Sequence, residues 1–474
     1  MQAGRDRNTG KNLDGNVIED AAASEGLLGR SHRSLTLGAV SLVALYAFEA
    51  LAVATAMPTV AQALDGLALY AMAFAGTLAS SVIGMVAAGR WADRSGPRVP
   101  LQHGIAWFAL GLLIAGLAPA MWVLLAGRVV QGFGGGLMSV SLYVVVGRAY
   151  PAHLRARIFA AFAAAWVLPA VIGPTISGLI VEHLGWRWVF LLVPLVAGTA
   201  AWMVLPALRG QEPLPDDGGG ESRDRHRLPW AVVAAASALG LHYAGQQAGV
   251  AAALLLAGSA VALLVSIRRL LPAGTLRAAR GLPSVIALRG IAAAAFFGTE
   301  VFLPLLLSRE RGLSPTWAGV ALTIGALGWS AGSWYRGRLT APSPVRVLRA
   351  GMGLLALGIC GAALAISPAV PVPVAMAGWV VAGLGMGLVF PSLSVLTLEL
   401  SPPARQGVNA SALQLCDALF TAATLALGGS LFAALLARAP LAAYLSGFIA
   451  TAVLAVLGAA VAGRVRPAIV SPDL

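Results

Sequence analysis

The sequence predicts an all-α membrane protein, built from two six-helix bundles and an inserted helix pair, because its apolar residues gather into long runs. Hydrophobic residues make up 58% of the 474 residues and charged residues 11%, against about 25% charged residues in soluble domains. Each run is about twenty residues long, which is the length of helix that crosses a bilayer. The basic residues, which give a net charge of +13, lie in short segments between the runs. This placement indicates membrane topology rather than a nucleic-acid-binding surface.

The apolar runs give about fourteen predicted membrane-spanning helices. We place them at residues 35–58, 67–88, 99–118, 120–147, 156–181, 187–208, 229–246, 248–267, 284–307, 315–337, 346–367, 371–399, 405–436 and 441–463. With both termini in the cytoplasm, few basic residues fall in external loops. These are Arg187, Arg309, Arg311 and Arg438. The excess of basic residues on the other side is typical of cytoplasmic loops, so the number of crossings is expected to be even.

Two polar segments divide the predicted spans into groups. Residues 209–228 follow six spans, and residues 268–283 precede the last six. The nearly uncharged stretch between them is interpreted as an inserted transmembrane hairpin, although loop charge alone does not separate fourteen spans from twelve. The predicted order is a disordered cytoplasmic N-terminus 1–34, a six-helix bundle 35–208, a linker 209–228, the hairpin 229–267, a linker 268–283, a six-helix bundle 284–463 and a cytoplasmic tail 464–474.

A short basic segment with one acid joins the second and third predicted spans. Its carboxylate, Asp93, can accept hydrogen bonds from a helix N-terminus or from arginines, forming a latch that breaks when helices move. The alternative is an ordinary positively charged cytoplasmic loop. The segment resembles the signature G-x-L-A-D-R-x-G-R-[KR] of the major facilitator superfamily, from which Trp91 and Pro97 depart. The residues that match, and that the resemblance implies form the latch, are Gly89, Asp93, Arg94, Gly96 and Arg98.

Four ionisable residues lie well within predicted spans, where charged side chains are rare. They are Glu49, Arg128, Glu300 and Asp417. Insertion scales assign about 2.5–3.5 kcal/mol to such a charge at a helix centre, so each residue marks a transport pathway or an ion pair. A buried carboxyl group can also take up a proton, which makes it a candidate proton carrier. For each acid, a structural hydrogen bond to a neighbouring helix is the alternative.

The surroundings of Glu49 resemble a signature of one group of transporters. Residues 48–58 are similar to the first-helix motif L-D-x-T-x-V-N-x-A-L-P of the fourteen-helix drug:proton antiporters, with Glu49 at the Asp position. Leu51 and Ala54 replace the polar Thr and Asn of that motif, which leaves this helix apolar around its acid. The resemblance implies that Glu49 couples transport to protons.

The fourth predicted span contains an arginine followed by a glycine-rich run. A permanently charged guanidinium at that depth requires a carboxylate or backbone carbonyls as acceptors. The segment resembles the superfamily motif R-x-x-Q-G-x-G, which the family associates with proton transfer. The matching residues are Arg128, Gln131, Gly132 and Gly134. The glycines also permit close packing of helices.

The fifth predicted span resembles the motif G-x-x-x-G-P-x-x-G-G, which marks exporters rather than importers. Gly173, Pro174 and Gly178 match it, whereas Pro169 and Ser177 stand where the family has glycine. Proline kinks a helix and glycine lets a neighbour approach. A kinked helix without a transport role is the alternative.

The second half of the sequence supplies two further acids within predicted spans. Glu300 and Asp417 are each expected to be a second proton site or a site for a substrate cation. The aromatic residues Trp166 and Phe297 are candidates to face the substrate, although aromatic residues in membrane helices more often pack. The sequence therefore predicts Glu49, Arg128, Asp417 and Glu300 as proton-coupling residues, with Glu300, Trp166 and Phe297 at the substrate.

These resemblances, which cover residues 35–463, imply a proton-coupled exporter of hydrophobic or cationic drug-like compounds. Its expected partners are a small-molecule substrate, protons and the lipid bilayer, without nucleic acid, metal or cofactor. It is expected to be a monomer in the plasma (inner) membrane and not an enzyme. A lipid, glycolipid or secondary-metabolite exporter, a proton-coupled importer and a non-transporting membrane sensor are the alternatives. An ATP-driven pump is unsupported because the sequence lacks a G-x-x-x-x-G-K-[ST] segment.

Overall fold

The protein is described by a computed structural model, in which the described residues form helices and no β-strand. These residues are 26–66, 69–210, 227–244, 249–313, 315–339, 343–436 and 438–466. The predicted all-α membrane fold is therefore confirmed. Most of the predicted N-terminal segment 1–34, linker 209–228 and tail 464–474 lies outside the described residues.

The first half of the chain forms six long helices. They are α2 (Arg33–Ala63), α3 (Tyr70–Ser95), α4 (Arg98–Gly116), α5 (Met121–Ala149), α6 (Ala152–His183) and α7 (Arg187–Ala207). Two of the connecting turns are made by glycines with positive φ, Gly96 at 74° and Gly185 at 91°. Glycine adopts this conformation without the steric penalty that a side chain brings.

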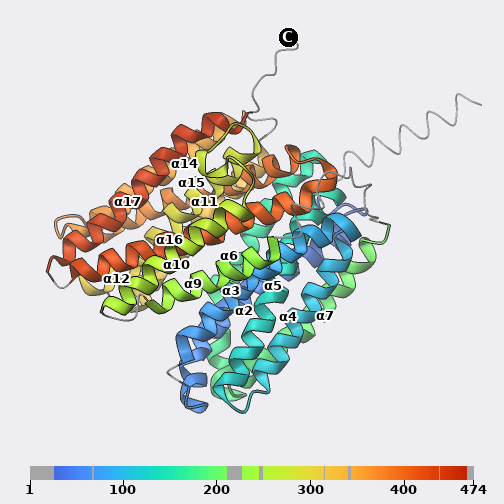
Figure 1. The fold of residues 1–474 in the computed structure, drawn as a ribbon, viewed down its shortest axis with the longest axis horizontal. Coiled ribbons are helices and arrows are strands. Elements are labelled where there is room, and N and C mark those ends of the chain that lie inside the picture. Colours follow the sequence, from blue (N-terminus) through green and yellow to red (C-terminus); the bar gives the residue numbers. More distant parts are fainter. Residues whose placement is uncertain are drawn as a thin grey trace, which may run out of the picture.

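Two further helices follow, α9 (Arg227–Ala244) and α10 (Val250–Leu270). They pack against each other, α9 also contacts α3, and both contact α16 of the second half. In Figure 1 they lie along the line between the two halves of the molecule. A short 3₁₀ turn, η2 (Thr275–Arg277), leads from them into the second half.

The second half forms the remaining long helices. They are α11 (Leu282–Glu300), α12 (Phe302–Arg309), α13 (Pro315–Arg338), α14 (Pro344–Ala363), α15 (Val372–Glu399), α16 (Gln406–Leu436) and α17 (Pro440–Val461), with the short 3₁₀ turns η3 (Leu364–Ile366), η4 (Pro403–Arg405) and η5 (Ala462–Val465). The span predicted at 284–307 is two helices, α11 and α12, interrupted at Val301. Pro304 lacks the amide that would donate to the carbonyl of Glu300, which accounts for the interruption.

Each half has its own apolar core. The first is built mainly from α2, α4, α5, α6 and α7, and the second from α11 to α17. A third apolar cluster joins α3, α9, α10, α11 and α16. Figure 1 shows the first half, coloured blue to green, beside the second half, coloured yellow to red. The two halves are thus two bundles that meet through a limited set of helices.

Twelve helical segments of the described residues are long and apolar enough to cross a membrane, with α11 and α12 counted together. Helices α9 and α13 are not among the twelve, so the fourteen-span count and the inserted hairpin remain predictions. Large apolar side chains on the outer surface are exposed, as lipid-facing side chains are, and Trp202 and Val250 are examples. The protein is therefore a multi-pass membrane protein.

The two bundles contact each other at one end of the molecule. There α3 meets α16, and α6 meets α13. A Cβ atom on Gly89 would lie 2.9 Å from the carbonyl oxygen of Gly407, and one on Gly337 would lie 3.5 Å from Cα of Arg157. We call this end, which carries residues 89–98, 148–157, 336–339 and 405–408, the basic end. Both helix pairs approach closely there.

Candidate functional site

A buried ion pair joins α2 and α5. Arg128 Nη1 donates to Glu49 Oε1, and it also donates to Gln131 Oε1 over 2.7 Å. Arg128 Nε donates to the carbonyl oxygen of Ala73 on α3 over 3.4 Å. Glu49 and Arg128 are only 3% and 4% exposed. Each charge therefore has a partner within the protein, as charges in a membrane interior require.

Glycines allow the helix carrying Arg128 to come close to its neighbours. A Cβ on Gly132 would collide with the backbone of Thr77 on α3, and a Cβ on Gly134 would collide with that of Phe108 on α4. The absence of side chains at these positions lets α5 approach both helices. This approach brings Arg128 within reach of Ala73 and of the acid on α2.

Aromatic side chains lie beside the Glu49 pair. The ring of Tyr46, one turn before Glu49 on α2, lies 6.1 Å from the ring of Trp166 and 5.9 Å from that of Phe108. Trp166 is 42% exposed. The predicted aromatic residue of α6 is thus close to the helix that carries the acid and is partly exposed.

The predicted export motif lies in α6, which runs through Pro169 and Pro174. A Cβ on Gly173 would lie 3.7 Å from the ring of Phe48 on α2. Ser177 Oγ donates to the carbonyl oxygen of Ala52 over 2.7 Å. Gly178 has open space around it, with no atom of the described part of the chain within 4 Å of an added Cβ. The motif therefore packs α6 against α2 at Gly173 but not at Gly178.

The Asp93 carboxylate lies at the N-terminus of α16. Its Oδ1 accepts a hydrogen bond from the backbone amide of Gly407 over 2.7 Å, and its Oδ2 accepts one from Val408 over 2.8 Å. Arg148 Nη2 of α5 lies 3.7 Å from Oδ1. A carboxylate here satisfies free amides and interacts favourably with the positive end of the helix dipole. Asp93 thus binds the two bundles together at the basic end.

The other latch residues lie around this contact. Gly89 faces Gly407, Gly96 ends α3 with φ 74°, and Arg94 lies in the last turn of α3. Arg98 begins α4, and its Nε is buried without a hydrogen-bond partner among the described residues. The sequence motif therefore covers the end of α3 and the start of α4, and its residues Gly89 and Asp93 contact the N-terminus of α16.

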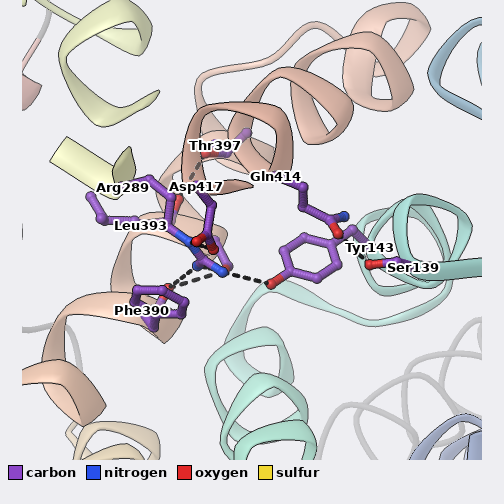
Figure 2. Close-up of polar contacts among 9 residues, drawn as sticks. Ser139, Tyr143, Arg289, Phe390, Leu393, Thr397, Gln414 and Asp417 are labelled. Carbon is purple, nitrogen blue, oxygen red and sulfur yellow. Dashed lines mark hydrogen bonds and ion pairs between the residues drawn. The ribbon is translucent and has the colours of Figure 1, made fainter. Parts of the chain in front are cut away.

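A second buried ion pair lies in the second bundle. Arg289 Nε of α11 donates to Asp417 Oδ2 of α16 over 3.0 Å. Arg289 Nη2 lies 3.4 Å from Tyr143 Oη of α5, across the boundary between the bundles (Figure 2). Nearby, Ser139 of α5 donates to Gln414 Oε1 of α16. Polar side chains of both bundles therefore meet around Asp417.

Arg289 is a buried charge that the sequence analysis missed. It lies close to the start of the span predicted at 284–307, where basic residues are typical of the cytoplasmic ends of membrane helices. The structure places it 4% exposed, two turns inside α11. An arginine flanked by Val285, Ile286, Leu288 and Ile291 was a signal that could have identified it.

Glu300 is separate from both ion pairs. It ends α11, and within the described part of the chain it has no hydrogen-bond or ion-pair partner. Phe297, one turn earlier, lies against Trp329 with their ring centroids 6.1 Å apart. The structure therefore does not bring Glu300 and Asp417 together. The described residues also hold no group of three or more His, Cys, Asp or Glu side chains suited to a metal ion.

Comparison with known proteins identifies one family. The sequence model of the Major Facilitator Superfamily matches residues 39–423. A probable multidrug-efflux transporter of Mycobacterium tuberculosis is 28% identical over 397 residues, covering 78% of this chain and 81% of the relative. The multidrug transporter protein MdtP of Bacillus subtilis is 32% identical over 184 residues, covering 39% of this chain and 34% of the relative.

Solved structures share the fold at low sequence identity. A human organic anion transporter has a TM-score of 0.67 at 16% identity, covering 91% of this chain and 99% of its own. A bacterial homologue of the iron transporter ferroportin, in an outward-facing state, has a TM-score of 0.65 at 12% identity, covering 91% and 98%. A proton:xylose symporter has a TM-score of 0.63 at 16% identity, covering 92% and 95%.

Proposed function

We propose that this chain, which belongs to the major facilitator superfamily, exports hydrophobic or cationic drug-like compounds in exchange for protons. The observation that carries the proposal is the buried pair Glu49–Arg128, which links α2 and α5 away from bulk water. The Mycobacterium tuberculosis relative, matched over 81% of its length, is named a probable multidrug-efflux transporter, which supports export. The Bacillus subtilis relative, matched over 34% of its length, is named a multidrug transporter. The packing of Gly173 against α2 fits the export motif of α6.

The proposed topology places the basic end in the cytoplasm, because positive charge is retained on that side of the membrane. Both termini are then cytoplasmic, and α9 and α13 are counted as spans in addition to the twelve apolar segments. We assign residues 35–208 and 284–463 to the two bundles and 229–267 to the inserted pair. The protein works as a monomer in the plasma membrane.

The proposed proton site is the Glu49 carboxyl. When Glu49 is ionised, it neutralises Arg128 and holds α2 to α5 through a charge-assisted hydrogen bond. When Glu49 takes up a proton, that attraction falls and Arg128 depends on Gln131 and on the carbonyl of Ala73. The two states favour different helix arrangements, and a ligand shifts a conformational equilibrium only through such a difference. Proton entry can therefore drive the change of conformation.

The Asp93 contact is the proposed latch of this cycle. With the carboxylate on the amides of Gly407 and Val408, the basic end is closed and the protein faces outward. Release of this contact opens the cytoplasmic side, where substrate enters. Rocking of the two bundles about a central site is the way repeats of this kind alternate.

The proposed substrate contacts are Glu300, Trp166 and Phe297. Glu300 has no partner in the described residues, and it lies where α11 is interrupted. The carbonyl of Glu300, deprived of its amide partner by Pro304, adds a further negative dipole at the same point. A cationic group of a substrate would be stabilised by both. The exposed face of Trp166 offers an apolar surface on the first bundle.

The experiment is transport into proteoliposomes with an imposed pH gradient, using a panel of cations, neutral compounds and lipids. Glu49→Gln keeps size and hydrogen bonding but removes titration. We expect it to abolish gradient-driven accumulation while binding of a neutral substrate persists. The matched control is Glu182→Gln, the same change at an exposed acid near the end of α6. Normal pH-dependent accumulation by Glu49→Gln would assign Glu49 a structural role.

A further inference from the structure

The guanidinium of Arg289 connects three helices beyond its own. Nε bonds to Asp417 of α16 over 3.0 Å, and Nη1 bonds to Ser394 Oγ and the carbonyl of Phe390 on α15 over 3.3 and 3.4 Å. Nη2 bonds to Tyr143 Oη of α5 over 3.4 Å. Figure 2 shows the side chain between the two bundles, with Tyr143 as the partner from the opposite one. One rigid planar group therefore has an ionic partner in one bundle and a neutral partner in the other.

The position of this guanidinium is tightly defined. Its central carbon lies 3.3 Å from the centre of the Phe390 ring, in a cation–π contact. The side chain is only 5% exposed. A guanidinium stays charged at all physiological pH, so its burial depends on a counter-ion. Asp417 is the one carboxylate of the described residues within 4.0 Å of it.

Asp417 is more accessible than its partner, because its side chain is 20% exposed. The carboxylate is therefore the more accessible group of the pair. The titratable groups around Asp417 are Cys416 on α16 itself, Arg289 from α11 and, through Arg289, Tyr143 from α5. The other helices packed on α16 are α3, α9, α10, α15 and α17, and their described residues place no charged side chain within ion-pair distance of Asp417.

We propose that Arg289 is a positioning residue that transmits the protonation state of Asp417 to the contact between the bundles. With Asp417 ionised, the ion pair fixes the guanidinium so that Nη2 is aimed at Tyr143, and the basic end is held closed. With Asp417 protonated, the hydrogen bond loses its charge assistance and the guanidinium is free to turn from Tyr143. Protonation thus weakens the seal at the basic end. This role deepens the proposed proton exchange and rests on it for its place in the transport cycle.

The chain contains an internal comparison for this idea. Ser139 lies one turn before Tyr143 on α5, and Gln414 lies one turn before Asp417 on α16. Their hydrogen bond also joins the bundles, but neither side chain titrates. Loss of the Ser139–Gln414 hydrogen bond should weaken closure of the basic end equally at every pH. Loss of the Asp417 charge should instead remove the pH dependence of closure.

The test measures closure directly, without substrate. Spin labels at His153→Cys on α6 and Arg338→Cys on α13, both exposed, report the distance between the bundles at the basic end. The exposed Cys360 is replaced by Ser, and the buried Cys416 is retained. Distance distributions are recorded by double electron–electron resonance in nanodiscs from pH 5 to pH 9. All labelled proteins carry Glu49→Gln, which removes the pH response proposed for the first bundle. We expect the ratio of closed to open molecules to fall by about tenfold at the acid end, given the strength of hydrogen bonds to charged groups.

The variants give distinct results. At every pH, Asp417→Asn should show the distance distribution that the parent protein shows at acid pH. Asp417→Glu should restore the pH dependence of the closed-to-open ratio. Tyr143→Phe should reduce the size of the pH response, and Ser139→Ala should lower closure by a similar factor throughout. Should Asp417→Asn not fold, Arg289→Gln/Asp417→Asn removes both charges together and must also abolish the pH response. A full pH response in either neutral variant, or identical effects of Tyr143→Phe and Ser139→Ala, would overturn the proposal.

The outcome is separable from that of the proposed transport function. Closure is measured without substrate, so a pH response through Asp417 stands even if gradient-driven export is absent. Conversely, if Glu49→Gln abolishes export while Asp417→Asn exports normally and keeps the pH response of closure, the proposal for Arg289 fails and the proposed function stands.

Discussion

Asp93 Oδ1 of α3 lies 2.7 Å from the backbone nitrogen of Gly407, in the first turn of α16. These residues are far apart in the sequence and belong to different bundles. The contact joins a negative side chain to the positive end of a helix, so its strength depends on the charge of a single carboxylate. Closure of the basic end therefore depends on the charge of the Asp93 carboxylate, which a substitution by asparagine removes without changing the size of the side chain.

Asp93→Asn should slow transport while leaving equilibrium substrate binding nearly unchanged. The amide keeps the shape of the carboxylate but loses the charge that favours the helix N-terminus, an interaction of about 0.5–2 kcal/mol. Stopped-flow transport and equilibrium binding, measured on the same preparation, separate the two effects. The control is Asp65→Asn, at an exposed turn residue whose positive φ of 48° asparagine tolerates. A large loss of binding with normal switching would contradict this role.

Arg128→Ala should destabilise the protein by about 3–5 kcal/mol, because it leaves Glu49 buried without its counter-ion. Thermal unfolding in detergent measures this loss. The double variant Glu49→Gln/Arg128→Gln should recover most of the loss. A double variant as unstable as Arg128→Ala would indicate that the charge of Glu49 is not responsible.

Gly132→Ala should lower the unfolding temperature, because its methyl group would meet the backbone of Thr77. Overpacking of this kind typically costs about 1–3 kcal/mol. Gly178→Ala should be neutral or slightly stabilising, because its site is open and alanine favours a helix by about 1 kcal/mol. Thermal melting of both variants under identical conditions gives the comparison. Similar melting temperatures would mean that α5 and α3 can separate without loss of stability.

Reporter fusions should read cytoplasmic at Gly210 and Arg464 and external at Gln246. The expectation follows from the distribution of basic residues and from counting α9 and α10 as two spans. Gln246 lies outside the described residues, so the fusion supplies information that the structure does not. A cytoplasmic reading at Gln246 would reduce the number of spans to twelve.

The sequence predicted the features that leave a local signal. Glu49 and Arg128 were found because a charge within an apolar run is conspicuous, and Asp93 was found by its spacing from glycines and arginines. Arg289 was missed because nearness to a span end cannot distinguish a buried arginine from an interfacial one. Tyr143 could not be found, because a neutral tyrosine in an apolar helix has no pattern that reveals a partner in the opposite bundle.

Helix α5 runs without proline from Met121 to Ala149. It carries Arg128 toward one end and Tyr143 and Arg148 toward the other, and these residues contact Glu49, Arg289 and Asp93 in turn. At 1.5 Å per residue, Arg128 and Arg148 are about 30 Å apart along its axis. A tilt of about 10° at one end would therefore displace the other by about 5 Å, roughly one helical turn. Helix α5 is thus long enough to act as a lever arm, by which a small tilt at one end becomes a large displacement at the other.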